Sequence, residues 1–394
     1  MEISVGILNL SGQIDSKLKD FLSQNSDKIK EVIYAKDLTD TENKAFQRNK
    51  ILENSSSDYI LWLSDSSVPD EDFLEEMVET AEEFPDAEVV YPNEVIIDLN
   101  SQENIRNFKD FYGKEEELLQ GLSFEKYLPE FGVLTKRESI ADLGSFDEEF
   151  EDYEFYRFLA FNIKNLKLKH SELSFVENKI TKTFVDTSYH SKTVRDILKI
   201  YDWKRDIFPL LNWENEKVAK STANTIVGDT LGRYFDYLNA SNFYREAVLA
   251  FHNQHSLKKL IDTFIQMGFF EKARYLLEKQ GMSEEDINYY EERISNIEKI
   301  VDELEKAVKE GKYEEVLKAI VEVVEIYEGA PIYNILGVIH FIGKDYEGAF
   351  RYLCKATTMN PVREEYVENL FEVAKLLGKE DKVNALLNRL IEEQ

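Results

Sequence analysis

Apolar residues at the start of the chain alternate between short continuous runs and helical stripes. Runs at Ile3–Leu8, 32–35 and 59–63 have the length of strands, and the last has the unbroken pattern of a strand covered on both faces. Stripes with apolar positions three or four residues apart lie between them, at 14–22 and 41–54. This βαβαβ order predicts a parallel sheet with right-handed crossovers.

The run at 59–63 ends in four short polar residues, Ser64, Asp65, Ser66 and Ser67. Open α/β sheets bind ligands at the carboxyl ends of their strands. Pro69 and the acidic residues after it are typical of a first helical turn, and an apolar stripe follows. We therefore expect a strand-to-helix turn that faces a binding crevice.

Further strands are predicted at 89–91, 95–98 and 132–135, but strand patterns stop at about Thr193, and helical periodicity follows. The predicted fold class is an α/β domain with a mainly parallel sheet, followed by an all-α repeat domain. The expected boundaries are 1–192 for the α/β domain, 193–255 for a helical linker with a degenerate repeat, and 256–394 for the repeats.

The helical half contains a recurring pattern of a glycine, an aromatic residue and a small residue. Its clearest copy, 331–361, has Gly337 and Ala349 where two helices would cross, and Tyr346 lies 33 residues after Tyr313 of the preceding copy. This pattern resembles the tetratricopeptide repeat, whose unit has about 34 residues. The resemblance implies a concave surface that suits an elongated peptide; the same repeats could instead form a homodimer interface.

Composition narrows the class of protein. With 77 acidic and 48 basic residues, the formal charge of −29 argues against nucleic acid and anionic membranes as partners. Cys354 is the single cysteine, so intrachain disulfides and thiolate metal sites are excluded. No stretch approaches the ~20 apolar residues that span a bilayer, and no leader pattern follows Met1. We expect a cytoplasmic protein.

Three stretches carry a family resemblance. They are Gln47-Arg48-Asn49, the apolar run that begins at Asp58, and Gly144-Ser145-Phe146-Asp147 with Glu151-Asp152 at a helix start. In order and spacing they resemble the family-2 inverting glycosyltransferases of the GT-A fold, over roughly residues 3–175. That family has an Ala-Arg-Asn helix, a strand leading into an Asp-x-Asp motif, and a Gly-Phe-Asp-Glu turn before an acidic pair.

The resemblance implies transfer of a sugar from a nucleotide-diphosphate donor, above all a UDP-sugar. Asp152 would be the base that deprotonates the acceptor, with Glu151 beside it in the acidic pair, and Arg48 would lie near the nucleotide. The alternatives are that Asp152 caps a helix and that Arg48 is a solvated helix residue.

The chain departs from the family pattern at three places. Ser64-Asp65-Ser66 replaces Asp-x-Asp, so Asp65 would have to bind Mn²⁺ or Mg²⁺ in the nucleotide-sugar site, or that site is metal-independent or inactive. Ala35-Lys36 replaces two base-reading aspartates, and Asp37 is displaced along the loop. The family's late histidine has no clean counterpart, and His190 is the candidate metal ligand.

We therefore expect a glycosyltransferase whose helical half presents a protein or peptide acceptor, which resembles bacterial enzymes acting on peptides and, more loosely, on flagellin. The alternative is a scaffold that binds a nucleotide sugar or a protein partner without catalysis. Ser64-Asp65-Ser66 favours the scaffold, whereas Glu151-Asp152 opposes it. A third interpretation, a lipid-linked or surface glycan as acceptor, is disfavoured because the sequence has no basic amphipathic segment. For the enzyme, Asp65 and Asp152 should line one cleft.

Overall fold

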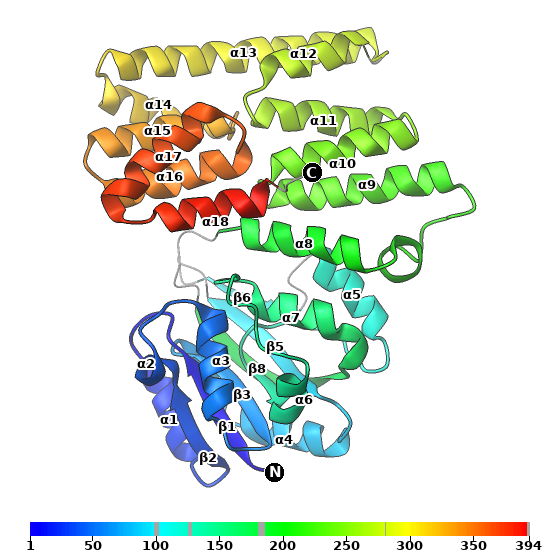
Figure 1. The fold of residues 1–394 in the computed structure, drawn as a ribbon, viewed down its shortest axis with the longest axis vertical. Coiled ribbons are helices and arrows are strands. Elements are labelled where there is room, and N and C mark those ends of the chain that lie inside the picture. The colour runs from blue at the N-terminus through cyan, green and yellow to red at the C-terminus, as the bar shows by residue number, and fades with distance from the viewer. Residues whose placement is uncertain (98–101, 125–127, 180–185, 280, 392–394) are drawn as a thin grey trace. The chain divides into compact units, whose positions relative to one another are not determined.

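The computed structural model describes residues 1–97, 102–124, 128–179, 186–279 and 281–391 (Figure 1). The chain divides into an α/β unit, Met1–Tyr189 with Arg195–Pro209, and a helical unit, His190–Val194 with Leu210–Gln394. The predicted fold class, an α/β domain followed by an all-helical region, is confirmed.

The first part of the α/β unit contains β1 (Ile3–Leu8), α1 (Ser16–Gln24), β2 (Ile29–Tyr34), α2 (Ala35–Leu38), α3 (Lys44–Asn54), β3 (Tyr59–Ser64), β4 (Ser67–Pro69) and α4 (Phe73–Glu83). It continues with β5 (Val89–Ile97), β6 (Glu103–Arg106), α5 (Glu115–Phe124), β7 (Val133–Lys136), α6 (Arg137–Asp142), α7 (Glu154–Asn162), η1 (Ile163–Asn165) and β8 (Leu168–Lys179). Helix α8 (Ser188–Ile200) supplies residues to both units, and η2 (Trp203–Ile207) belongs to the α/β unit.

The strands form one sheet in the order β2-β1-β3-β7-β5-β8-β4, and β6 pairs with β5. Strand β1 pairs in parallel with β2 and β3, as the βαβαβ pattern predicts, and β5 pairs in parallel with β8. The pairs β3–β7, β5–β7, β4–β8 and β5–β6 are antiparallel. The sheet is thus mixed rather than mainly parallel; β6, for example, follows β5 after too few residues for the crossover that a parallel strand needs.

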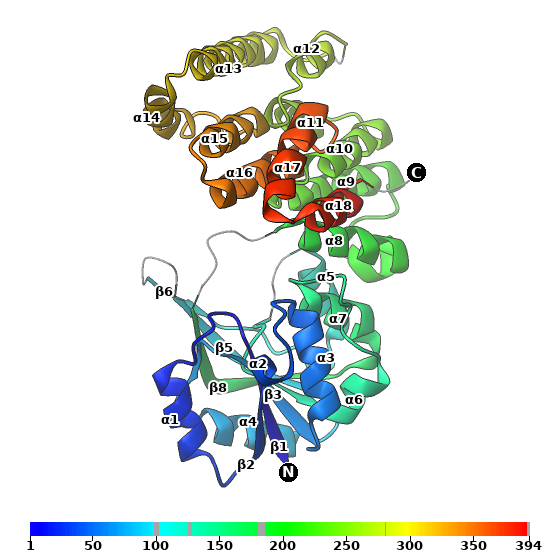
Figure 2. The ribbon, with the colours of Figure 1, turned by 60° about the vertical axis from the view of Figure 1, so that its left-hand side comes forward.

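Helices cover both faces of this sheet, as Figure 2 shows for α1 and α3. On one face, Phe21 of α1 and Phe73 of α4 share a core with Val5 of β1. On the other face, α3 lies so close to β1 that a Cβ added at Gly6 would be 2.6 Å from Ile51. This close packing fixes the start of α3 beside the carboxyl end of β1.

Two local predictions were wrong. Pro69 does not begin a helix but ends β4, and α4 begins at Phe73. Strand β4 lies at the edge of the sheet, where the missing N–H of proline is tolerated. The segments 89–91 and 95–98 are not separate strands, because β5 is continuous from Val89 to Ile97; Asp98 lies outside the described residues.

The helical unit is built from helices joined by short turns. They are α9 (Glu216–Arg233), α10 (Tyr237–Ala250), α11 (Gln254–Gln266), α12 (Phe270–Lys279), α13 (Glu284–Lys309), α14 (Tyr313–Val323), α15 (Ala330–Ile342), α16 (Tyr346–Met359), α17 (Glu364–Leu377) and α18 (Glu380–Leu390). A Cβ added at Gly337 of α15 would lie 2.5 Å from Leu353 of α16, so these two helices cross closely, as the repeat pattern predicts. Within the described ranges, no helix combines the length and hydrophobicity that a membrane span requires.

Candidate functional site

Asp65 lies in the turn between β3 and β4, where the loop after β1 encloses its carboxylate. Its Oδ2 accepts hydrogen bonds from the backbone N–H groups of Leu10 (3.1 Å), Ser11 (2.8 Å) and Gly12 (2.9 Å), and its Oδ1 accepts one from Ser11 (3.1 Å). Gly12 has a φ of +78°, a conformation that glycine adopts without strain. Asp65, only 2% exposed, therefore holds loop 10–12 at the carboxyl ends of β1 and β3.

The serines around Asp65 form a buried chain of hydrogen bonds. Ser64 Oγ lies 3.1 Å from Ser66 Oγ and 2.9 Å from Ser67 Oγ. Ser67 donates to Asn178 Oδ1 (2.7 Å), and Asn178 Nδ2 donates to Glu94 Oε1 (2.9 Å). The predicted nucleotide-binding hydroxyls of Ser64 and Ser66 thus bond within the protein and connect β3 to β8 and β5.

Two residues of the Gln47-Arg48-Asn49 motif hold neighbouring loops. Gln47 Oε1 accepts from the backbone N–H of Asn9 (2.8 Å), at the start of the loop that encloses the Asp65 carboxylate. The amide of Asn49 donates to the carbonyl of Phe146 (2.9 Å) and accepts from its N–H (2.8 Å). Helix α3 therefore connects the loop after β1 to the Gly144-Ser145-Phe146-Asp147 turn.

Arg48, which was predicted to lie near the nucleotide, is fully buried, so its guanidinium is not available at the surface for a ligand. Its Nε donates to Glu154 Oε1 (2.8 Å), and another guanidinium nitrogen donates to the Glu130 carbonyl (3.2 Å). The rings of Trp62 and Phe155 lie 5.2 and 4.9 Å from the guanidinium carbon. Enclosed by these groups, the guanidinium supports the folded core rather than an anionic donor, and it is not the solvated helix residue of the alternative interpretation either.

Asp152 is paired with a lysine that sequence reasoning missed. Lys44 Nζ, at the start of α3, lies 2.9 Å from Asp152 Oδ1 and 2.7 Å from Glu130 Oε1. Burial lowers the pKa of Lys44, but Glu130 and Asp152 outweigh burial and raise that pKa above its ordinary value. Lys44 is therefore a permanent cation, and the Asp152 side chain that it holds is still 18% exposed.

Two other carboxylates belong to the same buried ion-pair cluster, which consists of Lys44, Arg48, Glu130, Asp152 and Glu154. Burial and the neighbouring Glu130 raise the pKa of Glu154 above its ordinary value, against the opposing effect of the two cations. The signal in the sequence was the spacing of Lys44 and Arg48, four residues apart on one face of a helix. Their carboxylate partners are 82 or more residues away, so the sequence does not reveal the pairing.

The backbone next to Asp152 has an unusual conformation. Tyr153 has a φ of 66° and a ψ of 9°, in the left-handed region that costs a non-glycine residue about 1 kcal/mol or more. Tyr153, and not Asp152, is the N-cap residue of α7, and it makes no side-chain capping bond. The carbonyl of Glu151 accepts a hydrogen bond from the N–H of Lys44 (3.4 Å). The acidic pair is thus held against the start of α3.

One turn of α3 links the two predicted aspartates. Lys44 contacts Asp152, and Gln47, three residues later, contacts the loop held by Asp65. Side chains three residues apart on a helix are about 5–6 Å apart at their Cβ atoms. The structure therefore brings both aspartate turns to the start of the same helix.

A small hollow lies beside Asp65 at the carboxyl ends of β1 and β2. Tyr34 and Lys36 line it together with Asn9 and Gly12. The exposed Lys36 ammonium lies 5.6 Å from the centre of the Tyr34 ring. Asp37, the predicted base-reading carboxylate, follows in α2 and is exposed. The hollow offers an aromatic ring and a cation.

His190 belongs to the helical unit, where it is 2% exposed and its ring centre lies 3.9 Å from that of Tyr234. Among the residues that the structure describes, no group of three or more His, Cys, Asp or Glu side chains could hold a metal ion. Mg²⁺ and Mn²⁺ need several oxygen ligands, whereas three backbone N–H groups already donate to Asp65 and the serine hydroxyls bond to one another. These residues do not fit the predicted divalent cation.

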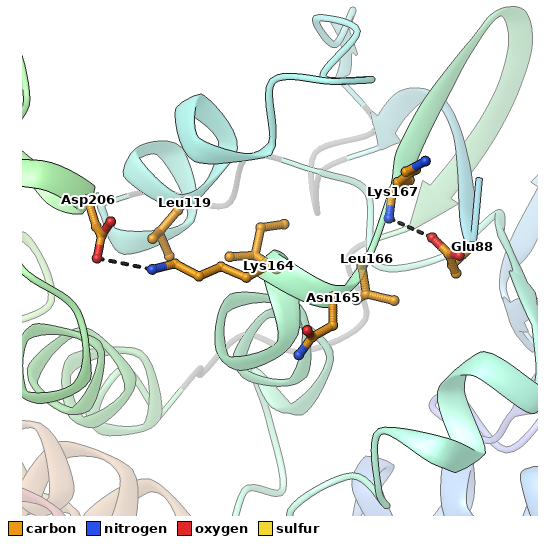
Figure 3. Close-up of a pocket in the computed structure, with 8 residues that line it drawn as sticks. Glu88, Leu119, Lys164, Asn165, Leu166, Lys167 and Asp206 are labelled. Atoms are coloured by element: carbon orange, nitrogen blue, oxygen red, sulfur yellow. Dashed lines mark hydrogen bonds and ion pairs between the residues drawn. The ribbon is translucent and has the colours of Figure 1, made fainter. Parts of the chain in front are cut away.

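A larger pocket of about 460 Å³ lies at the opposite edge of the sheet (Figure 3). Glu88 and Lys167, which precede β5 and β8, line it, and so do Lys164 and Asp206, whose side chains lie 3.2 Å apart. Because β5 runs in the same direction as β3, this is the amino-terminal edge of the strands. The predicted site residues do not line this pocket.

The sequence matches no protein-family model and no curated protein. Among solved structures, it is similar to S. aureus TarS, with 12% identity and a TM-score of 0.38 over 70% of this chain and 53% of the TarS chain. TarS 1–349 in complex with UDP gives 12% identity and a TM-score of 0.39, and its complex with UDP-GlcNAc gives 13% and 0.38; each covers 79% of this chain and 92% of that chain. Similarity at this level carries no conclusion about function, which has to come from the residues of the chain.

Proposed function

We propose that this chain is an inverting glycosyltransferase that moves a sugar from a nucleotide-diphosphate donor to a protein or peptide acceptor. The observation that carries the proposal is the α3 link, which joins the Asp65 turn and the Asp152 turn at the carboxyl edge of the sheet. Open α/β sheets bind ligands at this edge. The strained Tyr153 beside Asp152 adds support, because such backbone outliers concentrate at functional sites.

In the proposed reaction, Asp152 acts as the general base. Its carboxylate takes the proton of an acceptor hydroxyl while that oxygen attacks the anomeric carbon of the sugar. The bond from this carbon to the diphosphate oxygen breaks, the nucleoside diphosphate leaves, and the configuration at the carbon inverts. Lys44, whose ammonium lies 2.9 Å from Asp152 Oδ1, keeps the carboxylate oriented before the proton is transferred.

The helical unit is the proposed acceptor-binding part. Its hairpin of α15 and α16, with Gly337 against Leu353, supports the resemblance to a tetratricopeptide repeat, and such arrays present concave surfaces to peptides. The 26-residue α13 departs from the pattern, because it is too long for one of two helices in a unit of about 34 residues. Homodimer formation is the other use of these helices that we propose to test.

Donor hydrolysis tests the catalytic proposal although the acceptor is unidentified, because a water molecule can take the place of the acceptor hydroxyl. Purified full-length chain is incubated with UDP-, GDP-, CDP- and TDP-sugars, and release of the nucleoside diphosphate is measured. We expect Asp152→Asn to lower the rate about a hundredfold or more. Glu149→Gln, which changes an exposed acidic residue nearby, should leave the rate unchanged.

The scaffold is the second candidate function, and the enclosed carboxylate of Asp65 favours it. In that case a nucleotide sugar would bind without turnover, even with candidate acceptor peptides present. Equal hydrolysis by wild type and Asp152→Asn would remove Asp152 from the mechanism. Binding of a nucleotide sugar with no measurable hydrolysis or transfer would favour the scaffold and contradict the proposed enzyme.

A further inference from the structure

The structure gives Asp65 a role different from that of a metal ligand. A carboxylate has about four lone-pair sites, and three backbone N–H groups, those of residues 10–12, donate to Asp65, with the N–H of Ser11 shared between its two oxygens. These N–H groups direct their positive ends toward the carboxylate. A divalent cation at Asp65 would therefore have to displace hydrogen bonds and face several dipoles of its own sign.

Backbone contacts add to this arrangement. The N–H of Asp65 donates to the carbonyl of Leu8 (2.9 Å), and the carbonyl of Asp65 accepts from the N–H of Asp15 (2.8 Å). Side chain and backbone of one residue thus hold the whole segment from the end of β1 to the start of α1. This segment includes Asn9 and Gly12, which line the hollow.

This inference rests on the proposed function: we infer that a nucleoside diphosphate binds across the carboxyl edge of the sheet beside this hollow, which is itself only large enough for a few atoms, and that it binds without a divalent cation. Asp65 shapes loop 9–12, and Lys36 supplies the positive charge that faces the diphosphate. Lys36 is exposed, lines the hollow and projects near Tyr34, whose ring can stack on a base. A lysine ammonium is a compact charge of the kind that binds phosphate groups.

The test is calorimetric titration of the full-length chain with UDP, GDP, CDP and TDP, in EDTA and in Mn²⁺. We expect one of them to bind with affinities that agree within about twofold in the two buffers. Binding in Mn²⁺ but not in EDTA would overturn the inference and leave the proposed function intact. Binding in neither buffer would overturn both.

Two variants separate the roles of the residues. Asp65→Asn should weaken binding equally in both buffers, because loop 9–12 loses its anchor; a loss confined to Mn²⁺ would make Asp65 a metal ligand and contradict the inference. Asp72→Asn, at an exposed residue that makes no side-chain capping bond, is the matched control and should bind normally.

Lys36→Gln changes an exposed side chain, so it should fold even if Asp65→Asn does not. We expect about a tenfold loss of affinity for the nucleoside diphosphate and no change for the corresponding nucleoside. An unchanged diphosphate affinity, or an equal loss for the nucleoside, would contradict the charge role of Lys36.

Discussion

The two aspartates that the sequence predicts in one site are held in different ways. Backbone N–H groups surround the carboxylate of Asp65, which is almost fully buried. In contrast, a lysine side chain holds Asp152, whose side chain is 18% exposed. The first arrangement makes a carboxylate part of the chain's architecture. The second holds a carboxylate in position and leaves part of its surface exposed. The partners of a motif carboxylate thus distinguish a position that supports the fold from one that a ligand could reach.

The largest loss of stability should come from removing Lys44, the cation that holds Asp152. Lys44→Met removes a buried cation and leaves Glu130 and Asp152 facing each other without it. We expect a loss of about 3–5 kcal/mol in the free energy of unfolding, measured by urea denaturation. Lys50→Met, on the same helix but paired at the surface with Glu53, should cost about 1 kcal/mol or less. Similar losses for the two variants would contradict the buried ion-pair cluster.

Asp65→Ala removes the carboxylate that holds the loop after β1. It leaves the N–H groups of Leu10, Ser11 and Gly12 without their shared acceptor, so we expect a loss of about 2–4 kcal/mol. Thermal unfolding should show it as a fall in Tm of roughly 5–15 °C. The exposed control Asp72→Ala should change stability by no more than about 0.5 kcal/mol. A normal Tm for Asp65→Ala would mean that the carboxylate does not anchor the loop.

The smallest expected effect concerns Asp15, which follows the loop that Asp65 holds. The Lys179 ammonium, 2.6 Å from Asp15 Oδ2, holds the pKa of Asp15 below its ordinary value. A lowered folded-state pKa gives stability that is present above the unfolded value of 3.8 and is lost as pH falls through the folded value. Asp15→Asn can still cap α1, so it should cost about 0.5–1 kcal/mol at pH 7 and nothing once Asp15 is protonated. Urea midpoints of the wild type and Asp15→Asn at pH 7 and pH 3 measure how much of this stability loss remains at low pH. An equal loss at both pH values would rule out the ion pair.

The sequence predicted the elements that local periodicity specifies. The strand at 59–63, the helix that buries Leu18 and Phe21, and the change to an all-helical chain were all visible in the spacing of apolar residues. Pro69 was misread because an edge strand and a first helical turn accept proline equally well. Local patterns do not show which of these a fold will use.

The site was predicted less completely than the fold. The sequence singled out Asp65 and Asp152 as candidates, but their contacts are with Gly12 and Lys44, from distant parts of the chain. The partners of Arg48 were invisible for the same reason, since Glu154 is 106 residues away. A motif predicts which residues gather in a fold, whereas burial and pairing decide which of them a ligand can reach.

The central claim is that one donor site extends from the loop held by Asp65 to the turn that carries Asp152. Hydrogen exchange of the full-length chain, measured by mass spectrometry with and without a saturating nucleotide-sugar donor, tests it most directly. We predict slower exchange in peptides covering both 8–16 and 148–156. Protection of 8–16 alone, or of neither segment, would contradict a shared site and separate Asp152 from the donor.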